Sequence, residues 1–562
     1  MLRFVSATSA TVWAETDRRC TVEVLGRSAS TFCVAGHHYV LVVIDDLPRA
    51  SSLEYDVRLD GDIRWPAPDS TLPPSRIRTL GDGASRVVFG SCRSAAPHEP
   101  PWSLQLELDP RGRGMDALYT YALSMLDRPD QEWPDLAVFL GDQIYADESS
   151  PKTRERVANV RAGAEERDPD SVPPPEIVGG FEEYTWLYHE SWSPEIERWF
   201  FSNVPSVMVF DDHEMLDDWN ISAAWETEIK KKPWWEDHVT GGLMTYWIYQ
   251  HLGNLSPEVI KAEGLLDSLA AVADGEQLLR EWALRTDEFT AGPNRYRFNF
   301  VRDIGRVRLV IIDSRNGRVL EPGNRRMVDA EEWEWVSEAC RASGVDHLLI
   351  GTSLPLFVPI GLHDLQVWSE RICDGAWGRL GRKFGEWLRV KADMEDWAAF
   401  DRSFNDLAAL LGEIASAPEG GQGPATISVL SGDIHFAFAA EIQYAGSGPS
   451  AGRVHQLVSS PIRNALLGPE RTAMRLGTSV LARSIGRALR RLVGRRRPPM
   501  SWQIDVGPVF TNSLGQLSFD GRAARVLVLQ ARAHSDNVRP SFDEVIEFDL
   551  VAGARAHARN KQ

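Results

Sequence analysis

The fold is decided by a stretch that reads Leu136-Ala137-Val138-Phe139-Leu140-Gly141-Asp142. An apolar run without polar alternation is typical of a strand that is buried on both faces of a sheet. The run stops abruptly at a glycine and a carboxylate. Sheets that are covered by helices place their ligand-binding side chains at the carboxyl ends of such strands. The stretch therefore predicts a central strand with a polar site at its end.

The same pattern recurs along the chain. Apolar runs end in small, acidic or sulfur-containing residues at 87–89 before Gly90-Ser91-Cys92, 207–210 before Asp211-Asp212-His213, 307–312 before Asp313-Ser314-Arg315, 348–350 before Gly351-Thr352, and 427–430 before Ser431-Gly432-Asp433-Ile434-His435. Stretches with helical composition lie between them, at 115–127, 222–232 and 329–343. This succession of buried strands and helices predicts the α/β class.

The length of 562 residues exceeds that of one ordinary compact domain. Residues 1–66 show short alternating stretches, which predict a small N-terminal β-sandwich. Residues 67–84 are rich in proline and glycine and are expected to be a linker. We expect the catalytic body at 85–552, with insertions near 150–180, 360–420 and 468–500, and a tail at 553–562. The charged, proline-rich insertion near 150–180 is expected to be a loop.

Composition and charge exclude several classes of protein. Hydrophobic residues make up 43% and charged residues 25%, which is ordinary globular composition and excludes wholesale disorder. The net charge of −19 would repel a polyphosphate backbone, so we expect no nucleic acid partner. Five cysteines without a CxxC pair argue against a disulfide framework or a zinc ribbon. We see no signal peptide or membrane span and expect a location in the cytoplasm or peripheral at the membrane.

The strand ends carry the residue types of a metal site. Adjacent carboxylates such as Asp211 and Asp212 repel each other unless a cation or bases neutralise them. The six side chains that collect at the ends of four buried strands are Cys92, Asp142, Tyr145, Asp212, Asp433 and His435. Carboxylates suit calcium, magnesium or manganese, whereas thiolate and imidazole draw transition metals. Two kinds of metal sharing a carboxylate would suit hydrolysis at phosphorus.

Four blocks together resemble the signature of the alkaline phosphatase D (PhoD-like) metallophosphatase family. They are Gly90-Ser91-Cys92, Gly141-Asp142-Gln143-Ile144-Tyr145-Ala146-Asp147, Asp211-Asp212-His213-Glu214 and Ser431-Gly432-Asp433-Ile434-His435-Phe436. The resemblance implies a calcineurin-like metallophosphoesterase β-sandwich that is flanked by helices. It also implies that the small N-terminal all-β domain is fibronectin- or immunoglobulin-like.

The resemblance further implies ferric iron and calcium as cofactors. By position, Cys92, Asp142, Tyr145 and Asp433 would hold the iron. Asp142 would bridge to a calcium site that includes Asp212 and His435. His213 would stabilise the transition state as a metal-bound hydroxide attacks phosphorus. Arg93 and Arg315 are expected either to orient the phosphate or merely to balance the charge of the carboxylates.

We therefore predict an enzyme, a metal-dependent phosphoesterase that hydrolyses a phosphodiester or a phosphomonoester. A nuclease or phospholipase on the same fold is one alternative. A catalytically degenerate protein that binds phosphorylated ligands or anionic lipid is another. The chain departs from the family pattern at Asp217-Asp218, where asparagine is usual, and at Trp397-Ala398-Ala399-Phe400, where the usual block is WDGY. The second block lines the mouth of the site in relatives, so substrate choice is expected to differ.

Residues 471–497 contain nine arginines and no acidic residue, with apolar residues at roughly helical spacing among them. Three interpretations remain open for this segment. It is an amphipathic helix on an anionic membrane surface, a positive wall that attracts a phosphorylated substrate, or a solvated loop. The interleaved leucines and valines favour a helix, and we rank lipid ahead of nucleic acid as its partner.

Overall fold

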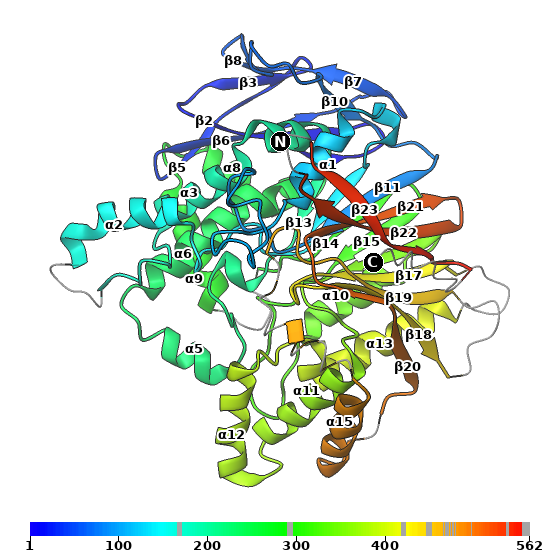
Figure 1. The fold of residues 1–562 in the computed structure, drawn as a ribbon. Helices are drawn as coiled ribbons and strands as arrows, with labels where there is room; N and C mark the ends of the chain where they lie inside the picture. The colour runs from blue at the N-terminus through cyan, green and yellow to red at the C-terminus, as the bar shows by residue number, and fades with distance from the viewer. Residues whose placement is uncertain are drawn as a thin grey trace.

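Two mixed β-sheets form the body of the protein in the computed structural model (Figure 1). The structure describes residues 1–552 except 166–170, 289–295, 417–422, 446–451, 465, 467–470, 473, 475–476, 478, 496 and 535–538. The first sheet has the order β13 (Ser206–Met208), β12 (Leu136–Phe139), β11 (Ser85–Gly90), β21 (Ser513–Asp520), β22 (Ala523–Arg532), β23 (Ser541–Asp549). The second has the order β14 (Phe300–Ile304), β15 (Val307–Ile311), β16 (His347–Gly351), β17 (Thr426–Ser431), β19 (Arg453–Val458), β18 (Ala437–Tyr444), β20 (Met500–Val509).

The predicted central strands are confirmed, and they run parallel where the site forms. In the first sheet β11, β12 and β13 are parallel neighbours, and in the second sheet β15, β16 and β17 are parallel neighbours. Their carboxyl ends therefore reach the same edge of each sheet. Because the run 427–430 belongs to the second sheet, the four blocks come from two sheets rather than one.

Successive residues of these strands enter different cores, as expected of strands buried on both faces. Leu309 and Ile311 share an apolar core with Phe89 of the first sheet. Val310, between them, packs on the opposite face in a second core with Val336 and Leu407. This alternation between two cores explains why the sequence shows continuous apolar runs instead of a polar alternation.

Helices cover the two sheets. Their bounds are α1 (Ala117–Met125), α2 (Pro151–Glu165), α3 (Phe181–Trp192), α4 (Glu195–Asn203), α5 (Ala223–Ile229), α6 (Trp235–Thr245), α7 (Pro257–Glu263), α8 (Leu265–Ala270), α9 (Glu276–Glu288), α10 (Ala330–Cys340), α11 (Ile360–Cys373), α12 (Gly378–Lys391), α13 (Asp401–Ala415) and α15 (Val480–Leu492). α1, α5 and α10 lie within the three stretches that were predicted to be helical. None of the helices within the described ranges is long and apolar enough to span a bilayer.

The N-terminal region is all-β, as predicted. Its strands are β1 (Leu2–Val5), β2 (Ala10–Thr16), β6 (His37–Ile44) and β5 (Phe32–Val34) in one sheet, β4 (Arg27–Ser30), β3 (Thr21–Val24), β8 (Val57–Leu59) and β9 (Asp62–Trp65) in another, and the pair β10 (Ser75–Arg78) and β7 (Ser52–Tyr55). These sheets lie at one end of the body (Figure 1). The fibronectin- or immunoglobulin-like label stays a prediction.

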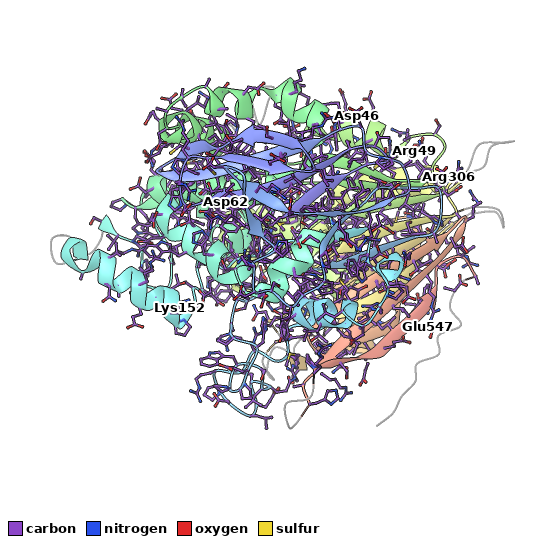
Figure 2. All side chains as sticks on the ribbon, turned by 90° about the horizontal axis from the view of Figure 1, so that it is seen from above. Asp46, Arg49, Asp62, Lys152, Arg306 and Glu547 are labelled. Atoms are coloured by element: carbon purple, nitrogen blue, oxygen red, sulfur yellow. The ribbon has the colours of Figure 1, made fainter. Side chains whose placement is uncertain are left out.

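Two boundaries differ from the sequence prediction. β10 lies inside the range 67–84 that was expected to be a linker, and it pairs with β7 over Ser75–Arg78, so the β-region continues to Arg78. The insertion that was expected to be a loop begins as helix α2, which projects from the body beyond the labelled Lys152 (Figure 2). Proline at the first helical position and the arginine, glutamate and alanine residues that follow it favour this helix. The tail expected at 553–562 lies outside the described residues.

Candidate metal centre

Four of the predicted site residues follow three of the central strands, and the backbone at each of these residues is strained. Cys92 follows β11, Asp142 follows β12, and Asp433 and His435 follow β17. All four have positive φ, at 58°, 50°, 64° and 55° respectively. Left-handed backbone costs a non-glycine residue on the order of 1–3 kcal/mol and clusters at functional sites. The fold therefore holds four side chains in costly conformations around one point.

Two glycines allow the strand ends to approach one another. A Cβ at Gly141 would collide with the Asp211 carboxylate, and a Cβ at Gly432 would collide with the Ser91 hydroxyl. Gly141 also has a φ of 109°, which favours glycine. At each of the two Gly-Asp pairs, the glycine therefore lies in close contact with a loop that follows a different strand.

Among the described residues, four groups of side chains bring potential ligand atoms within 4.8 Å of one another, and three of these groups lie at this site. They are Cys92 with Asp142 and His435, Asp142 with Asp212 and His213, and Asp142 with Asp211, Asp212 and Asp433. Asp142 belongs to all three groups. His435 lies in one group with Cys92 and Asp142, and its predicted pairing with Asp212 stays a prediction.

The Asp142 carboxylate is buried without a partner. Neither of its oxygens has a hydrogen-bond partner among the described residues. Burial raises its pKa well above the ordinary range, and negative charge on Cys92 and Asp211 raises it further. A buried carboxylate without hydrogen bonds is strongly unfavourable unless a cation neutralises it. This orphaned group fits a metal ion that several side chains share.

Cys92 and Tyr145 show the same need for a cation. Burial, followed by the negative charge of Asp433, raises the pKa of the Cys92 thiol to about 12. Burial and then the charges of Cys92 and Asp142 raise the pKa of Tyr145 well above its ordinary value. The Tyr145 hydroxyl accepts a hydrogen bond from Asn464 Nδ2 at 2.9 Å. Both groups would ionise at neutral pH only beside a strongly Lewis-acidic ion.

His213 lies between the cluster and a second carboxylate. Its Nδ1 is 2.8 Å from Asp147 Oδ1. Burial alone would lower its pKa, but the charges of Asp147 and then Asp142 outweigh burial and raise the pKa well above 6.5. Because Asp147 occupies Nδ1, the other ring nitrogen remains available to the site.

Glu214 joins the loops instead of facing a metal. Its carboxylate accepts hydrogen bonds from the backbone N–H groups of Asp142 at 3.1 Å, Gln143 at 2.7 Å and Asp211 at 2.9 Å. These bonds fix the loop after β12 against the loop after β13. Glu214 is therefore a positioning residue for the carboxylates on either side of it.

Arg315 contributes positive charge to the centre of the cluster. Its buried guanidinium pairs with Asp211, with Asp212 at 3.0 Å, with Asp433 at 2.9 Å and with Glu395. Every nitrogen of the guanidinium has a carboxylate partner. The structure thus supports the charge-balancing role of Arg315 that the sequence left open beside phosphate orientation.

Arg93 points away from the cluster. Its guanidinium is buried and donates to Asp116 Oδ2 at 2.9 Å, to Glu197 Oε1 at 2.7 Å and to Ser191. Asp116 in turn caps the start of α1. Because these partners use all three nitrogens, the Arg93 side chain is bound within the body and does not orient a phosphate in this arrangement. The buried partners of Arg93 are distant from it along the chain, so no local sequence pattern indicates this role.

A cavity of about 1320 Å³ opens above the cluster. Asp142, Asp212, His213, Asp433 and His435 lie on its wall. Four basic side chains, Arg113, Lys152, Arg154 and Lys391, also line it and have no carboxylate partner among the described residues. The cavity thus combines an acidic floor, suited to cations, with basic groups suited to an anionic substrate.

The acidic residues of the loop after α12 were not among the predicted site residues. Asp393, Glu395 and Asp396 line the cavity, and Asp393 has a φ of 47°. Burial, followed by the charge of Glu395, raises the pKa of Asp393 well above its ordinary range. The acidic run directly before Trp397 was the available signal.

The divergent block after this loop is part of the core. Trp397 is fully buried and its Nε1 donates to Thr352 Oγ1 at 3.2 Å. Ala398, Ala399 and Phe400 are also fully buried. In this chain the preceding acidic residues, and not the tryptophan block itself, line the cavity.

Residues 118–250 match the family model described as PhoD-like phosphatase. The chain contains a PhoD-like phosphatase domain. This match confirms the predicted resemblance. The matched range includes Asp142, Tyr145, Asp212 and His213. Cys92, Asp433 and His435 lie outside it and reach the site because the two sheets pack together. Residues 1–77 match a model described as a domain of unknown function, DUF7800. Among curated proteins, none matches the chain.

One solved structure shares the fold of this chain. A structure titled as that of PhoD is similar over 100% of this chain and 91% of its own, with 11% identity and a TM-score of 0.58. At that identity the likeness shows the fold. A structure titled as that of a dimetal phosphatase from Danio rerio aligns over 80% of this chain and 96% of its own, with 9% identity and a TM-score of 0.29. The PhoD-like domain supports an enzyme with phosphoesterase activity.

Proposed function

We propose that this protein is a metal-dependent phosphoesterase on a calcineurin-like sandwich, with its metals on the carboxylate cluster beneath the cavity. The observation that carries the proposal is Asp142. This carboxylate is buried, has no hydrogen-bond partner among the described residues and belongs to all three groups of potential ligands at this site. A shared cation would neutralise it and would bring two metal sites together.

The donor set favours ferric iron beside calcium. Cys92, Tyr145, Asp142 and Asp433 offer a thiolate, a phenolate and carboxylates, which suit ferric iron. Asp211 and Asp212 offer only oxygens, which suit calcium. His435 lies with Cys92 and belongs with the iron in this proposal. When bound, the metals would activate water and polarise the phosphoryl oxygens.

The residues of the chain itself would bind and orient the substrate. Asp147 holds His213 Nδ1, so the imidazole presents its other nitrogen to the cavity, where it would donate a proton to a phosphoryl or leaving oxygen. Arg113, Lys152, Arg154 and Lys391 would attract the anionic substrate from the cavity wall. Arg315 would hold the carboxylates in place, since its guanidinium is fully covered by them.

The size of the cavity favours a phosphodiester. About 1320 Å³ is above the usual range of roughly 300–1000 Å³ for small-molecule sites. A bare phosphate with one small substituent would leave most of this space empty. A substrate with groups on both sides of the phosphorus would fill it and contact the basic wall.

The test compares Asp142→Asn with the wild type after loading with iron and calcium. We expect the wild type to bind both metals and to hydrolyse an aryl phosphodiester, whereas Asp142→Asn loses most of both. Asp267→Asn, an exposed aspartate of α8, is the matched control and should behave as the wild type. Full metal content and activity in Asp142→Asn would disprove the shared site. Binding of a phosphodiester by metal-loaded wild type without any turnover would indicate a degenerate binding protein instead.

A further inference from the structure

Two helices expose apolar side chains in stripes at one end of the molecule. On α12, Leu380, Phe384 and Trp387 follow one another at helical spacing, and Leu380 is 85% exposed. On α15, Leu481, Ile485 and Leu492 form a similar stripe, with Leu481 70% exposed. Large contiguous apolar patches are rare on the surface of monomeric proteins and mark sites of interaction.

Both helices pack against α11, so the two stripes lie at the same end of the body. A Cβ at Gly486 of α15 would lie 2.8 Å from the Gly361 carbonyl oxygen, and Arg490 pairs with Asp364 at 3.1 Å. A Cβ at Gly385 of α12 would lie 3.0 Å from Cys373 Sγ. Figure 1 shows α11, α12 and α15 together at the end of the body opposite the N-terminal sheets. We call the outward surface of α12 and α15 the helical end face.

Basic residues accompany both stripes. On α15, Arg487 and Arg491 are exposed beside the apolar stripe and have no carboxylate partner within the described ranges. On α12, Arg379, Arg382 and Lys383 are exposed. Glu386, the acidic residue of α12, forms an ion pair with Arg325. The helical end face is thus basic although the whole chain carries a net charge of −19.

We propose that the helical end face docks on an anionic phospholipid bilayer. Helices with an apolar stripe and flanking lysine or arginine residues lie in the membrane interface, where apolar groups enter the acyl boundary and cations meet the headgroups. The apolar side chains project outward from two helices instead of lining a groove, which suits insertion into a deformable lipid surface. Tryptophan at position 387 suits the same interface.

The position of the cavity agrees with this docking. Lys391 at the end of α12, Leu362 of α11 and Met474 before α15 all line the cavity. A molecule that rests on the helical end face would therefore hold the cavity close to the lipid headgroups. This extension rests on the proposed phosphoesterase activity and implies a phosphodiester that is carried by a lipid.

The first test measures co-sedimentation with vesicles of phosphatidylcholine, alone or mixed with phosphatidylglycerol. We expect binding to the mixed vesicles that weakens in high salt, and little binding to phosphatidylcholine alone. Arg487→Gln with Arg491→Gln should weaken partitioning by roughly 25-fold, because each basic residue near an anionic surface contributes about fivefold. Leu380→Ser with Trp387→Ser, and Leu481→Ser with Ile485→Ser, should weaken it as well.

Matched controls lie on other surfaces. Val160→Ser on α2 removes an apolar side chain that is 64% exposed, and Lys261→Gln on α7 removes an exposed cation. Both should bind vesicles as the wild type does, and thermal unfolding should show that every variant is folded. Wild-type protein that ignores anionic vesicles, or end-face variants that bind like the wild type, would overturn the proposal. Loss of self-association in these variants, without any vesicle binding by the wild type, would make the face a contact between copies and would also overturn it.

A second assay separates docking from catalysis. Hydrolysis of a phosphodiester lipid in anionic vesicles should fall in the end-face variants, while hydrolysis of a water-soluble aryl phosphodiester stays unchanged. Equal rates for wild type and variants on the vesicle substrate would reject the lipid-borne substrate. If the wild type hydrolyses neither compound, the proposed activity fails, and vesicle co-sedimentation alone decides the docking.

Discussion

The Nδ1 atom of His213 lies 2.8 Å from Oδ1 of Asp147, and this contact joins the loops that follow β12 and β13. The same carboxylate accepts a hydrogen bond from the Asp217 backbone N–H at 2.6 Å. Asp147 therefore fixes both the direction of the imidazole and the chain beyond it. A carboxylate that orients a histidine in this way is a common support of metal and catalytic sites.

We expect Asp147→Asn to lower kcat/KM for a phosphodiester by about 10- to 100-fold, as is typical when such a supporting carboxylate is lost. Its neighbour Glu148 also lines the cavity but is exposed, so Glu148→Gln serves as the control and should change the rate little. Steady-state kinetics on metal-loaded protein checks this prediction. Unchanged kinetics in Asp147→Asn would show that His213 needs no support from Asp147.

The effect of the Asp142→Asn substitution on the free energy of unfolding should change sign when the metals are removed. In metal-free protein, Asp142→Asn should raise the free energy of unfolding by about 1–3 kcal/mol, because it replaces a buried carboxylate without hydrogen bonds by a neutral group. With metals present, the wild type should be the more stable protein, because ligand binding stabilises the folded state. Urea unfolding with and without a chelator measures both differences. A metal-free variant that is less stable than metal-free wild type would contradict this account.

Arg93→Met should destabilise the protein without affecting substrate affinity. It leaves the buried carboxylates of Asp116 and Glu197 without their arginine, a loss of about 3–5 kcal/mol for a broken buried ion pair. Arg306→Met removes a fully exposed arginine that pairs with Asp346, which keeps Arg522 as a second partner, and should change the stability little. Chemical unfolding and KM are the two measurements. A large rise in KM with unchanged stability would restore Arg93 as a phosphate ligand.

Stability should fall with rising pH through the titration of His37. The hydrogen bond to Glu15 is the main cause that raises the His37 pKa from 6.5 to about 9. Because the folded-state pKa is the higher one, the stabilisation is complete below about pH 6.5 and is lost as the pH rises through about 9. His37 also contacts Glu182 of α3 at 2.7 Å, so this charge links the N-terminal sheets to the body.

The measurement is the thermal midpoint of wild type and His37→Gln across this pH range. The wild type should exceed the variant most at about pH 6.5 and approach it by about pH 9. A difference between the two proteins that does not change with pH would contradict the assignment of this titration to His37.

The sequence by itself determined the class of the fold, the strands and the chemical types at the site. Continuous apolar runs such as 136–140 can only be strands or helices buried on all sides, and their short length and abrupt polar ends identified them as central strands. Cys92, Asp142, Asp212 and Asp433 could be found because each follows such a run directly. These signals are local, so they survive without knowledge of the tertiary structure.

The tertiary structure alone decided which groups meet. Arg93 and Arg315 look alike in sequence, yet one is held by Asp116 and Glu197 while the other lies among the carboxylates of the cluster. His435 lies with Cys92, and Glu395 joins the cluster from a loop that follows a helix. Such pairings depend on how two sheets and their loops pack, and burial in a medium of low polarity makes each pairing energetically decisive. For these reasons the sequence specified the donors, and packing specified their partners.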